Sequence, residues 1–340
     1  MADDMHRRRV WVLAAAFTAA ALVLGYLGSR FLSSPPAPNL EKLSIALPSV
    51  PHAALLHIAA AKGYFAEEGL EVTVVPTIHG KAAIDLMVQG KADLGTASEV
   101  VFVLAAMKGG ALGIAANMFS SSNDLAVIAR RDRGISAPRD LAGKKIGVSL
   151  GTAGEYFLWA LLIRHKLPPG SVTLVDMPPG QFAQELTKGT LDAVATWQPN
   201  VLNAQLALDD NAVTFHEPLA YTETFNVIGR SDFLKGHSKA IEKLVRAILK
   251  AEQFNRAQPE EALNLVAQLL KIDVESMRPI WKVLSFRVDL AQSQLITLED
   301  VARWALARGY AEKGSVPNFL PHLYLDALLA VQPERVTVVR

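Results

Sequence analysis

Cysteine is absent from the 340 residues of this chain, and neither sign of charge is in excess. Without cysteine there are no disulfide bonds, thiolate metal sites, iron–sulfur clusters or cysteine nucleophiles. The 34 Lys and Arg residues against 33 Asp and Glu residues leave no basic surplus to bind a polyanion, so nucleic-acid binding is not expected as the main function. Aromatic residues are few, at 7%, whereas 51% of the residues are hydrophobic, which is enough for one large or two medium-sized domains.

Motifs of common catalytic and metal sites are missing as well. The eight histidines are scattered, and no two of them have the H-x-x-H or H-E-x-x-H spacing of a metal site. The chain has no G-x-S-x-G nucleophile elbow and no Walker phosphate loop. We therefore predict a protein that is not an enzyme and that has neither a cofactor nor a metal site.

The first forty residues predict export. Three arginines at residues 7–9 precede an apolar run over residues 10–27, and a Pro-rich linker, SSPPAPN, follows at 33–39. A basic segment before an apolar core is typical of an export signal, with the N-terminus in the cytoplasm. The run approaches the roughly 20 residues needed to span a bilayer, and no small-x-small cleavage site follows it. We favour an anchor over residues 1–32 and a linker over 33–40, which would tether the chain to the inner membrane in the periplasm. The alternative is a signal peptide that is cleaved to release the protein.

The rest of the chain alternates strands and helices. Strands separated by single helices predict crossover connections and a mostly parallel sheet, and the same strand–helix order occurs in residues 43–130 and again in 145–207. The final third has apolar residues three and four positions apart, which predicts helices. The predicted strands are residues 43–47, 70–76, 93–96, 111–117, 125–130, 145–149, 172–177, 192–196 and 227–229, and the predicted C-terminal helices are 239–256, 259–270, 274–283 and 297–308. The expected fold is α/β, with two lobes and a helical C-terminal extension.

Four segments of these lobes resemble a known family. They are AAAKGYFAEEGLEV at residues 59–72, QGKADLG at 89–95, DLAGKKIGV at 140–148 and GTLDAVATWQP at 189–199. In this order they are similar to segments of ABC-transporter substrate-binding proteins of the alkanesulfonate, taurine and nitrate type and of NMT1/THI5-like proteins. Fungal relatives that make a pyrimidine use a cysteine-rich motif, which this chain lacks.

The resemblance implies a type II periplasmic-binding-protein fold that closes on a small-molecule ligand. Lobe 1 would comprise residues 41–125 and 226–340, and lobe 2 would comprise residues 126–225, with hinge strands at both ends. The resemblance further implies that the closed protein delivers its ligand to an ABC permease subunit.

Ligand contacts are expected where strands end and helices begin, because ligands of open parallel sheets lie at the carboxyl ends of the strands. The junctions at residues 49–52, 96–99 and 151–155 would turn free backbone N–H groups and positive helix ends toward a cleft, which suits an anion. Residues after another strand and near the two hinges complete the set. The candidate ligand-binding residues are Ser49, His52, Thr96, Ser98, Glu99, Ser122, Gly151, Thr152, Ala153, Glu155, Trp197 and Phe225.

Several of these residues have a structural alternative. Thr152 and Glu155 form a T-x-x-E pattern, which is typical of a capping box that satisfies its own helix. His52 is alternatively an exposed loop histidine, and Trp197 a packing residue. Glu99 gains stability from the dipole of the helix that it begins; in a cleft it would repel a simple anion and favour an amine, a ring N–H or a hydroxyl.

The predicted function is that of an extracytoplasmic solute-binding component of an ABC import system. Two lobes would close over a small organic or anionic solute, such as a sulfonate, nitrate or a pyrimidine-like compound. The alternative is a periplasmic ligand-sensing subunit of a signalling system, which would share every sequence feature described above.

Overall fold

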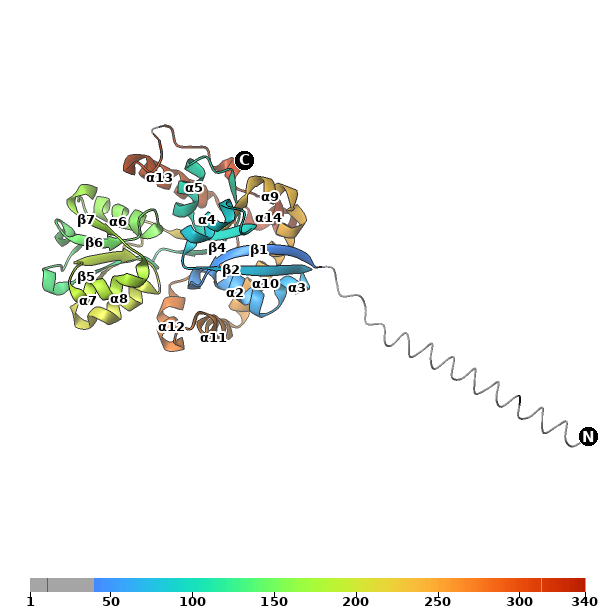
Figure 1. Ribbon diagram of the computed structural model, residues 1–340, viewed down its shortest axis with the longest axis horizontal. Helices are drawn as coiled ribbons and strands as arrows, with labels where there is room; N and C mark the ends of the chain where they lie inside the picture. The colour runs from blue at the N-terminus through green and yellow to red at the C-terminus, as the bar shows by residue number, and fades with distance from the viewer. Residues whose placement is uncertain (1–10, 12–39, 313, 340) are drawn as a thin grey trace, which may run out of the picture. The chain divides into compact units, whose positions relative to one another are not determined.

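Two five-stranded sheets organise the computed structural model, which describes residues 11, 40–312 and 314–339 (Figure 1). The strand order is β2-β1-β3-β10-β4 in the first sheet and β7-β6-β8-β5-β9 in the second. The strands are β1 Glu41–Pro48, β2 Leu70–Thr77, β3 Leu94–Ser98, β4 Leu112–Ser121, β5 Ala126–Arg130, β6 Lys145–Val148, β7 Thr173–Asp176, β8 Ala193–Thr196, β9 Ala212–Phe215 and β10 Glu223–Arg230.

The N-terminal segment is not part of this description. The predicted anchor over residues 1–32 and the predicted linker over 33–40 lie, apart from residues 11 and 40, outside the described residues. Across the described part of the chain, no helix is both long enough and apolar enough to cross a membrane.

Each sheet contains one reversed strand. In the first sheet β1 is parallel to β2 and β3, whereas β10 is antiparallel to β3 and β4. In the second sheet β6 is parallel to β7 and β8, whereas β5 is antiparallel to β8 and β9. The prediction of a mostly parallel sheet missed these two strands. Both are the strands by which the chain enters a sheet from the other one, so each starts at the edge where its neighbours end.

The chain therefore crosses between the sheets twice. Residues 122–125 join β4 to β5, and residues 216–222 join β9 to β10. The first sheet contains the strands before the first crossing and the strand after the second, and the second sheet contains the strands between the two crossings. The protein therefore has two lobes joined by two connecting segments.

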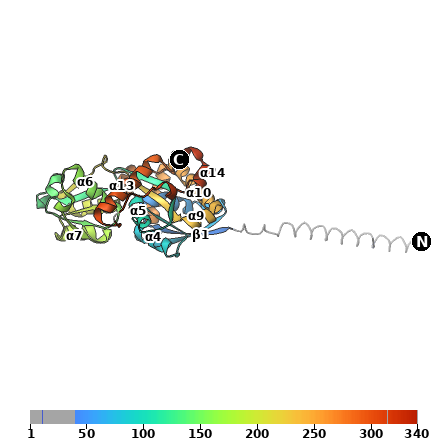
Figure 2. The same ribbon diagram turned by 90° about the horizontal axis from the view of Figure 1, so that it is seen from above.

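Helices cover both faces of each sheet. In Figure 1, α4 and α5 lie on one side of the first sheet and α2 and α10 on the other. In the second sheet α6 and α7 lie on opposite sides in both views (Figures 1 and 2). The helices are α2 Ala54–Ala61, α3 Tyr64–Glu67, α4 Gly80–Val88, α5 Glu99–Met107, α6 Ala153–Arg164, α7 Phe182–Lys188, α8 Asn200–Leu208, α9 Ser231–Gly236, α10 Ser238–Ala257, α11 Pro259–Leu270, α12 Val274–Lys282, α13 Gln292–Arg308 and α14 Asp326–Val331.

Strand β8 shows how the sequence builds these layers. Ala193 and Ala195 are buried in the large core that also contains residues of α6, whereas Val194 is buried in a second cluster with Phe182 and Leu186 of α7. Successive side chains of a strand point to opposite faces, so a strand of only apolar residues is covered on both sides.

The helical extension follows the sequence pattern over α10, α11 and α12, whereas the short helices α9 and α14 were not predicted and the start of α13 was placed too late. The predicted helix 259–270 is α11, whereas the helix predicted over 297–308 begins at Gln292. The first turn of α13 consists of polar residues, so the spacing of apolar residues did not indicate that the helix begins there. Gln294 is nevertheless only 3% exposed, because its Nε2 donates a hydrogen bond to Asn226 Oδ1 at 2.5 Å.

Gly154 in the first turn of α6 allows this helix to approach β8. A Cβ atom at this position would lie 2.8 Å from the carbonyl oxygen of Ala195, which is backbone, whereas a Cβ atom at Gly170 would meet nothing within 4 Å. We expect Gly154→Ala to lower the free energy of unfolding by about 1–3 kcal/mol through overpacking, and Gly170→Ala to change it by less than about 0.5 kcal/mol. Urea unfolding of the full chain in mild detergent measures both, and equal midpoints would contradict the close approach.

Candidate functional site

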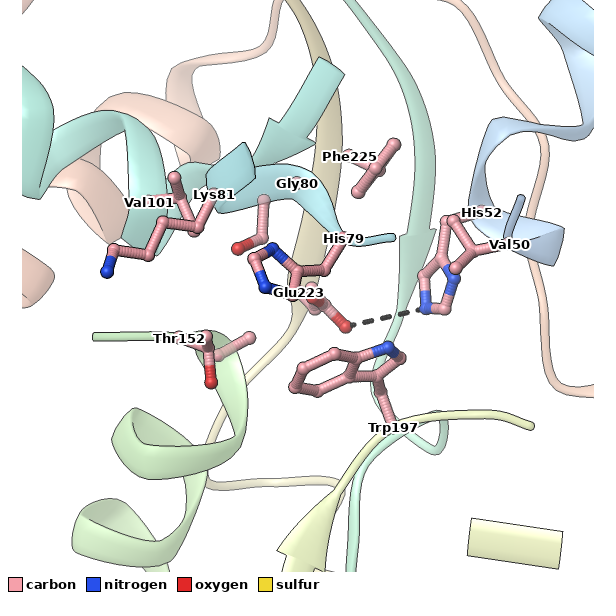
Figure 3. A pocket seen from close by; sticks show the side chains of 12 residues that line it. Val50, His52, His79, Gly80, Lys81, Val101, Thr152, Trp197, Glu223 and Phe225 are labelled. Carbon is pink, nitrogen blue, oxygen red and sulfur yellow. Dashed lines mark ion pairs between the residues drawn. The ribbon is translucent and has the colours of Figure 1, made fainter. Parts of the chain in front are cut away.

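A small cavity lies where the two sheets face each other. Its volume is about 30 Å³, which is room for about one or two water molecules. Figure 3 shows the Glu223 carboxyl group near its centre, with the Trp197 ring on the side of the second sheet. The lining residues are Val50, His52, His79, Gly80, Lys81, Ser98, Val101, Thr152, Ala153, Trp197, Glu223 and Phe225.

The cavity is built at the carboxyl ends of strands. His52 follows β1, Ser98 ends β3, Thr152 precedes α6 after β6, and Trp197 follows β8. Since the parallel strands of each sheet end at the same edge, residues far apart in the sequence converge here. The cavity also receives the first turn of α4, through Gly80 and Lys81, and of α6, through Ala153.

A wider outer groove adjoins the cavity. It has a volume of about 580 Å³ and shares the lining residues Lys81 and Val101 with the cavity. Leu104 of the first sheet's layer and Leu150 and Gly151 beside the second sheet also line it. In Figure 3 the Lys81 side chain extends away from Glu223. Lys81 also lines the outer groove.

Glu223 lines the cavity, and a second buried acid, Asp124, lies behind His52 and outside the lining. His52 Nε2 is 2.8 Å from Asp124 Oδ2 and 3.9 Å from Glu223 Oε2. Burial raises the pKa of the Glu223 carboxyl well above its ordinary value, and the neighbouring carboxyl groups of Asp124 and Glu99 raise it further. This side of the cavity can hold a proton or a cation, whereas the helix ends opposite it suit an anion.

Comparison with known proteins identifies the family. The model of the family described as NMT1/THI5 like matches residues 50–262, which is more than half of the chain. The chain belongs to the NMT1/THI5-like family. The predicted family is thereby confirmed.

Relatives of this NMT1/THI5-like protein include binding proteins. A protein of Brucella abortus (strain 2308), named as a binding protein, is 27% identical over 222 residues, which are 64% of this chain and 67% of that protein. The taurine-binding periplasmic protein of Escherichia coli (strain K12) is 25% identical over 219 residues, 63% of this chain and 67% of that protein.

A solved structure shows the fold. The periplasmic aliphatic sulphonate binding protein SsuA of Escherichia coli superimposes with a TM-score of 0.72 at 14% identity, covering 84% of this chain and 98% of that one. The predicted fold class, a two-lobed α/β protein of the periplasmic-binding type with helical C-terminal part, is confirmed.

Six of the twelve predicted site residues of this NMT1/THI5-like chain line the cavity. They are His52, Ser98, Thr152, Ala153, Trp197 and Phe225. Gly151 lines the outer groove instead. His52 is not the exposed loop histidine that the sequence also allowed, because it is 2% exposed and hydrogen-bonded to Asp124. That these residues contact a ligand remains a prediction.

Glu99 does not line the cavity, and a contact between Glu99 and a ligand stays a prediction. It is fully buried, and its carboxylate accepts hydrogen bonds from the Tyr221 hydroxyl and, at 2.8 Å each, from the backbone N–H and the hydroxyl of Thr224. Burial raises the pKa of Glu99, while these hydrogen bonds act in the opposite direction. Glu99 thus binds the chain segment that returns from the second sheet.

Three further predicted residues also fall outside the cavity lining. Thr96 is buried and donates to the carbonyl oxygen of Ala46 at 3.3 Å. Ser49 is exposed and caps no helix, since a 3-10 turn at Pro51–Ala53 precedes α2. Ser122 lies half-buried in the crossing between β4 and β5.

The capping box that the T-x-x-E pattern allowed at the start of α6 does not form. The Thr152 hydroxyl donates to the Ser149 carbonyl at 2.7 Å and caps nothing. Glu155 Oε2 accepts from the N–H of Gly151 at 2.8 Å and from the Tyr310 hydroxyl at 2.5 Å, and Oε1 lies 3.1 Å from Arg308 Nη2. Glu155 therefore joins α6 to the end of α13 and lines no part of the cavity.

The other half of the lining was not predicted from the sequence. Gly80 and Lys81 follow β2 in the same strand-to-helix pattern that identified the other junctions, so that pattern was a usable signal. Glu223 lies at the start of β10, and Asp124 in the crossing before β5. Nothing in the local sequence distinguishes these two acids from ordinary turn residues.

Glu99 should make the stability of the protein depend on pH. Because its pKa is raised above 4.5 in the folded state, the folded state binds the proton more tightly, and this stabilisation is lost as the pH rises through the folded pKa. We expect wild-type unfolding free energy to fall as the pH rises above 4.5, and Glu99→Gln to make this fall less steep. The exposed Glu71 of β2 supplies the control, Glu71→Gln. Urea unfolding across this range tests the prediction, and parallel profiles for Glu99→Gln and wild type would contradict it.

Proposed function

We propose that this protein is the solute-binding component of an ABC import system, binding a small organic solute in the cleft and delivering it to a permease. The observation that carries the proposal is a cavity walled by the strand ends of both sheets, with residues such as Ser98 on one side and Trp197 on the other. The relatives named as binding proteins support the same role. A cleft that both lobes complete suits capture by closure.

Closure would take place about the two crossings. In this proposal residues 41–125 and 226–340 form lobe 1 and residues 126–225 form lobe 2, with the hinges in and beside 122–125 and 216–222. A cavity of about 30 Å³ is smaller than an organic solute, so entry requires the lobes to part. The contact of Glu155 in lobe 2 with Arg308 and Tyr310 in lobe 1 would then stabilise the closed form.

Breaking this contact should weaken solute binding without touching the cavity. We expect the double substitution Arg308→Gln and Tyr310→Phe to favour the open form, to enlarge the radius of gyration in X-ray scattering and to reduce solute affinity several-fold. Arg303→Gln is the control, because Arg303 pairs with Glu299 and Asp300 within α13. Unchanged scattering and affinity in the double variant would show that the contact does not control closure.

The solute is proposed to carry an anionic group. The first turns of α4 and α6 meet at the cavity, and unpaired backbone N–H groups at helix starts attract anions. Lys81 adds a cation at the boundary with the outer groove. The relatives that bind taurine and aliphatic sulphonates support a sulfonate, and Trp197 and Phe225 supply apolar surface for its organic part.

Export to the periplasm belongs to the same proposal. The basic and apolar residues at 7–27 are typical of an export signal, and they would either tether the protein to the inner membrane or be removed by cleavage. We further propose that the protein does not alter its solute.

A thermal-shift screen of the full chain tests this function. Taurine, aliphatic sulfonates, nitrate and aminopyrimidines serve as probes, and a solute present at 100 times its Kd should stabilise the fold by roughly 2.7 kcal/mol. Trp197→Ala should weaken the binding about tenfold or more, since an aromatic contact contributes about 0.5–1.5 kcal/mol beyond its buried area. Trp281→Ala is the matched control, because Trp281 of α12 is also half-buried and lines neither the cavity nor the groove.

The outcomes separate the candidate functions. A hit that is recovered chemically unchanged supports a binding protein, whereas turnover of the solute would point to an enzyme. If no probe stabilises the protein, even after denaturation and refolding to remove any carried-over ligand, the transport proposal fails for these solutes. Retention of a signalling protein rather than a permease by the solute-loaded chain would favour the sensing role.

A further inference from the structure

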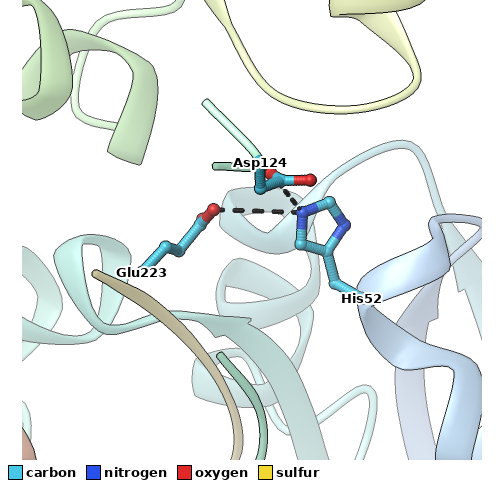
Figure 4. Close-up of side chains that lie close together, drawn as sticks. All are labelled: His52, Asp124 and Glu223. Carbon is cyan, nitrogen blue, oxygen red and sulfur yellow. Dashed lines mark hydrogen bonds and ion pairs between the residues drawn. The ribbon is translucent and has the colours of Figure 1, made fainter. Parts of the chain in front are cut away.

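Three ionisable side chains from three separate segments converge beside the cavity, and two of them, His52 and Glu223, line it. His52 lies in the turn after β1, Asp124 in the crossing to β5, and Glu223 at the start of β10. Figure 4 shows both carboxyl groups directed at the same edge of the imidazole ring. His52 Nε2 lies 2.8 Å from Asp124 Oδ2 and 3.9 Å from Glu223 Oε2.

All three residues are withdrawn from solvent. Their exposed fractions are 2%, 0% and 3% for His52, Asp124 and Glu223. Asp124 Oδ1 and Glu223 Oε2 have no hydrogen-bond partner among the described residues. A buried carboxyl oxygen without a partner is costly, so a positively charged group that binds the free oxygen atoms of both acids would stabilise the cluster.

The described residues supply no such group apart from the imidazole. No arginine lines the cavity, and the ion pairs of Asp124 and Glu223 are with His52 alone. Lys81 lines the cavity, but its side chain extends away from Glu223 (Figure 3). A solute anion at the start of α4 and α6 would thus face two buried acids across a narrow space.

We propose that His52, Asp124 and Glu223 bind a divalent transition-metal ion of the Zn²⁺ class. One ligand atom from each residue lies within 4.8 Å of the other two. Zn²⁺ binds imidazole nitrogen and carboxylate oxygen at about 2.0–2.2 Å, so modest side-chain rotations bring all three atoms to one ion. The imidazole ligand favours Zn²⁺ over Mg²⁺ and Ca²⁺, which prefer sites made only of oxygen atoms.

The fourth position of this ion would face the cavity. His52 and Glu223 both line it, and three protein ligands plus one open position is the pattern of zinc sites that bind an exchangeable group. The ion would neutralise the two acids and offer an electrophilic contact to an anionic solute. This consequence for the solute rests on the proposed function, whereas the metal site itself does not.

The test measures Zn²⁺ binding to the full chain without a histidine tag, stripped with EDTA. Calorimetry should give one Zn²⁺ per chain, and Co²⁺ in its place should give the visible absorption bands of a low-symmetry site. We expect Glu223→Gln and Asp124→Asn each to weaken Zn²⁺ binding at least tenfold, and Mg²⁺ at millimolar concentration not to compete. Circular dichroism shows whether each variant is folded. If a variant does not fold, the Co²⁺ spectrum of the wild type still tests the proposal.

Glu217→Gln is the matched control. His165 Nε2 and Glu217 Oε2 form a similar pair at 2.9 Å, without a second carboxylate at the imidazole, so this substitution should leave Zn²⁺ binding unchanged.

Each negative result has a distinct meaning. If the wild type binds no Zn²⁺ at millimolar concentration, or if Glu223→Gln binds it as tightly as the wild type, the metal site is wrong and the acids share a proton. If an amine-bearing solute binds the stripped protein and loses its affinity in Glu223→Gln, the acids bind the amine instead. If Zn²⁺ binds and no solute does, the metal site stands and the proposed transport function fails.

Discussion

The hydrogen bonds of the buried Glu99 carboxylate place the segment on which the candidate site depends. This side chain begins α5 in the first sheet's layer, and it accepts bonds from Tyr221 and Thr224, which flank the end of the crossing from the second sheet. Neighbouring residues of a strand point to opposite faces. Once Thr224 is bonded to Glu99, Glu223 is turned the other way, toward His52 and the cavity. A buried polar contact that stabilises the returning chain thus also aims an acid into the cleft.

The cleft combines two kinds of electrostatic surface within a short distance. The starts of α4 and α6 and the Lys81 ammonium group favour negative charge, whereas Asp124 and Glu223 favour positive charge. Such an arrangement favours ligands that carry both negative and positive charge, either on a single solute or on an anionic solute bound together with a cation. The two crossings pass directly beside the acids, so charge bound there would also act on the segments about which the lobes are proposed to move.

Much of the fold could be predicted because it depends on local pattern. All the described strands except β9, and the helices from α10 to α12, follow runs of apolar residues whose spacing differs between the two kinds of element, and α11 was placed at its observed bounds. The start of α13 could not be predicted in this way, because Gln294 is buried through a hydrogen bond to Asn226 and not through apolar character. The strands β5 and β10 were predicted, but their reversed direction was not, because strand direction depends on which sheet the chain comes from.

The candidate site also has features that the sequence predicts and features that depend on the tertiary structure. The sequence alone determined the family, the α/β class, and the strand-end junctions at which His52, Ser98, Thr152 and Trp197 were expected, because these features are encoded over a few neighbouring residues. Only the tertiary structure decided that Glu99 and Glu155 serve internal hydrogen bonds, and that Asp124 and Glu223 meet His52. Asp124 lies 72 positions after His52 in the chain, and Glu223 lies farther along still. The three residues meet because the two crossings bring distant segments together.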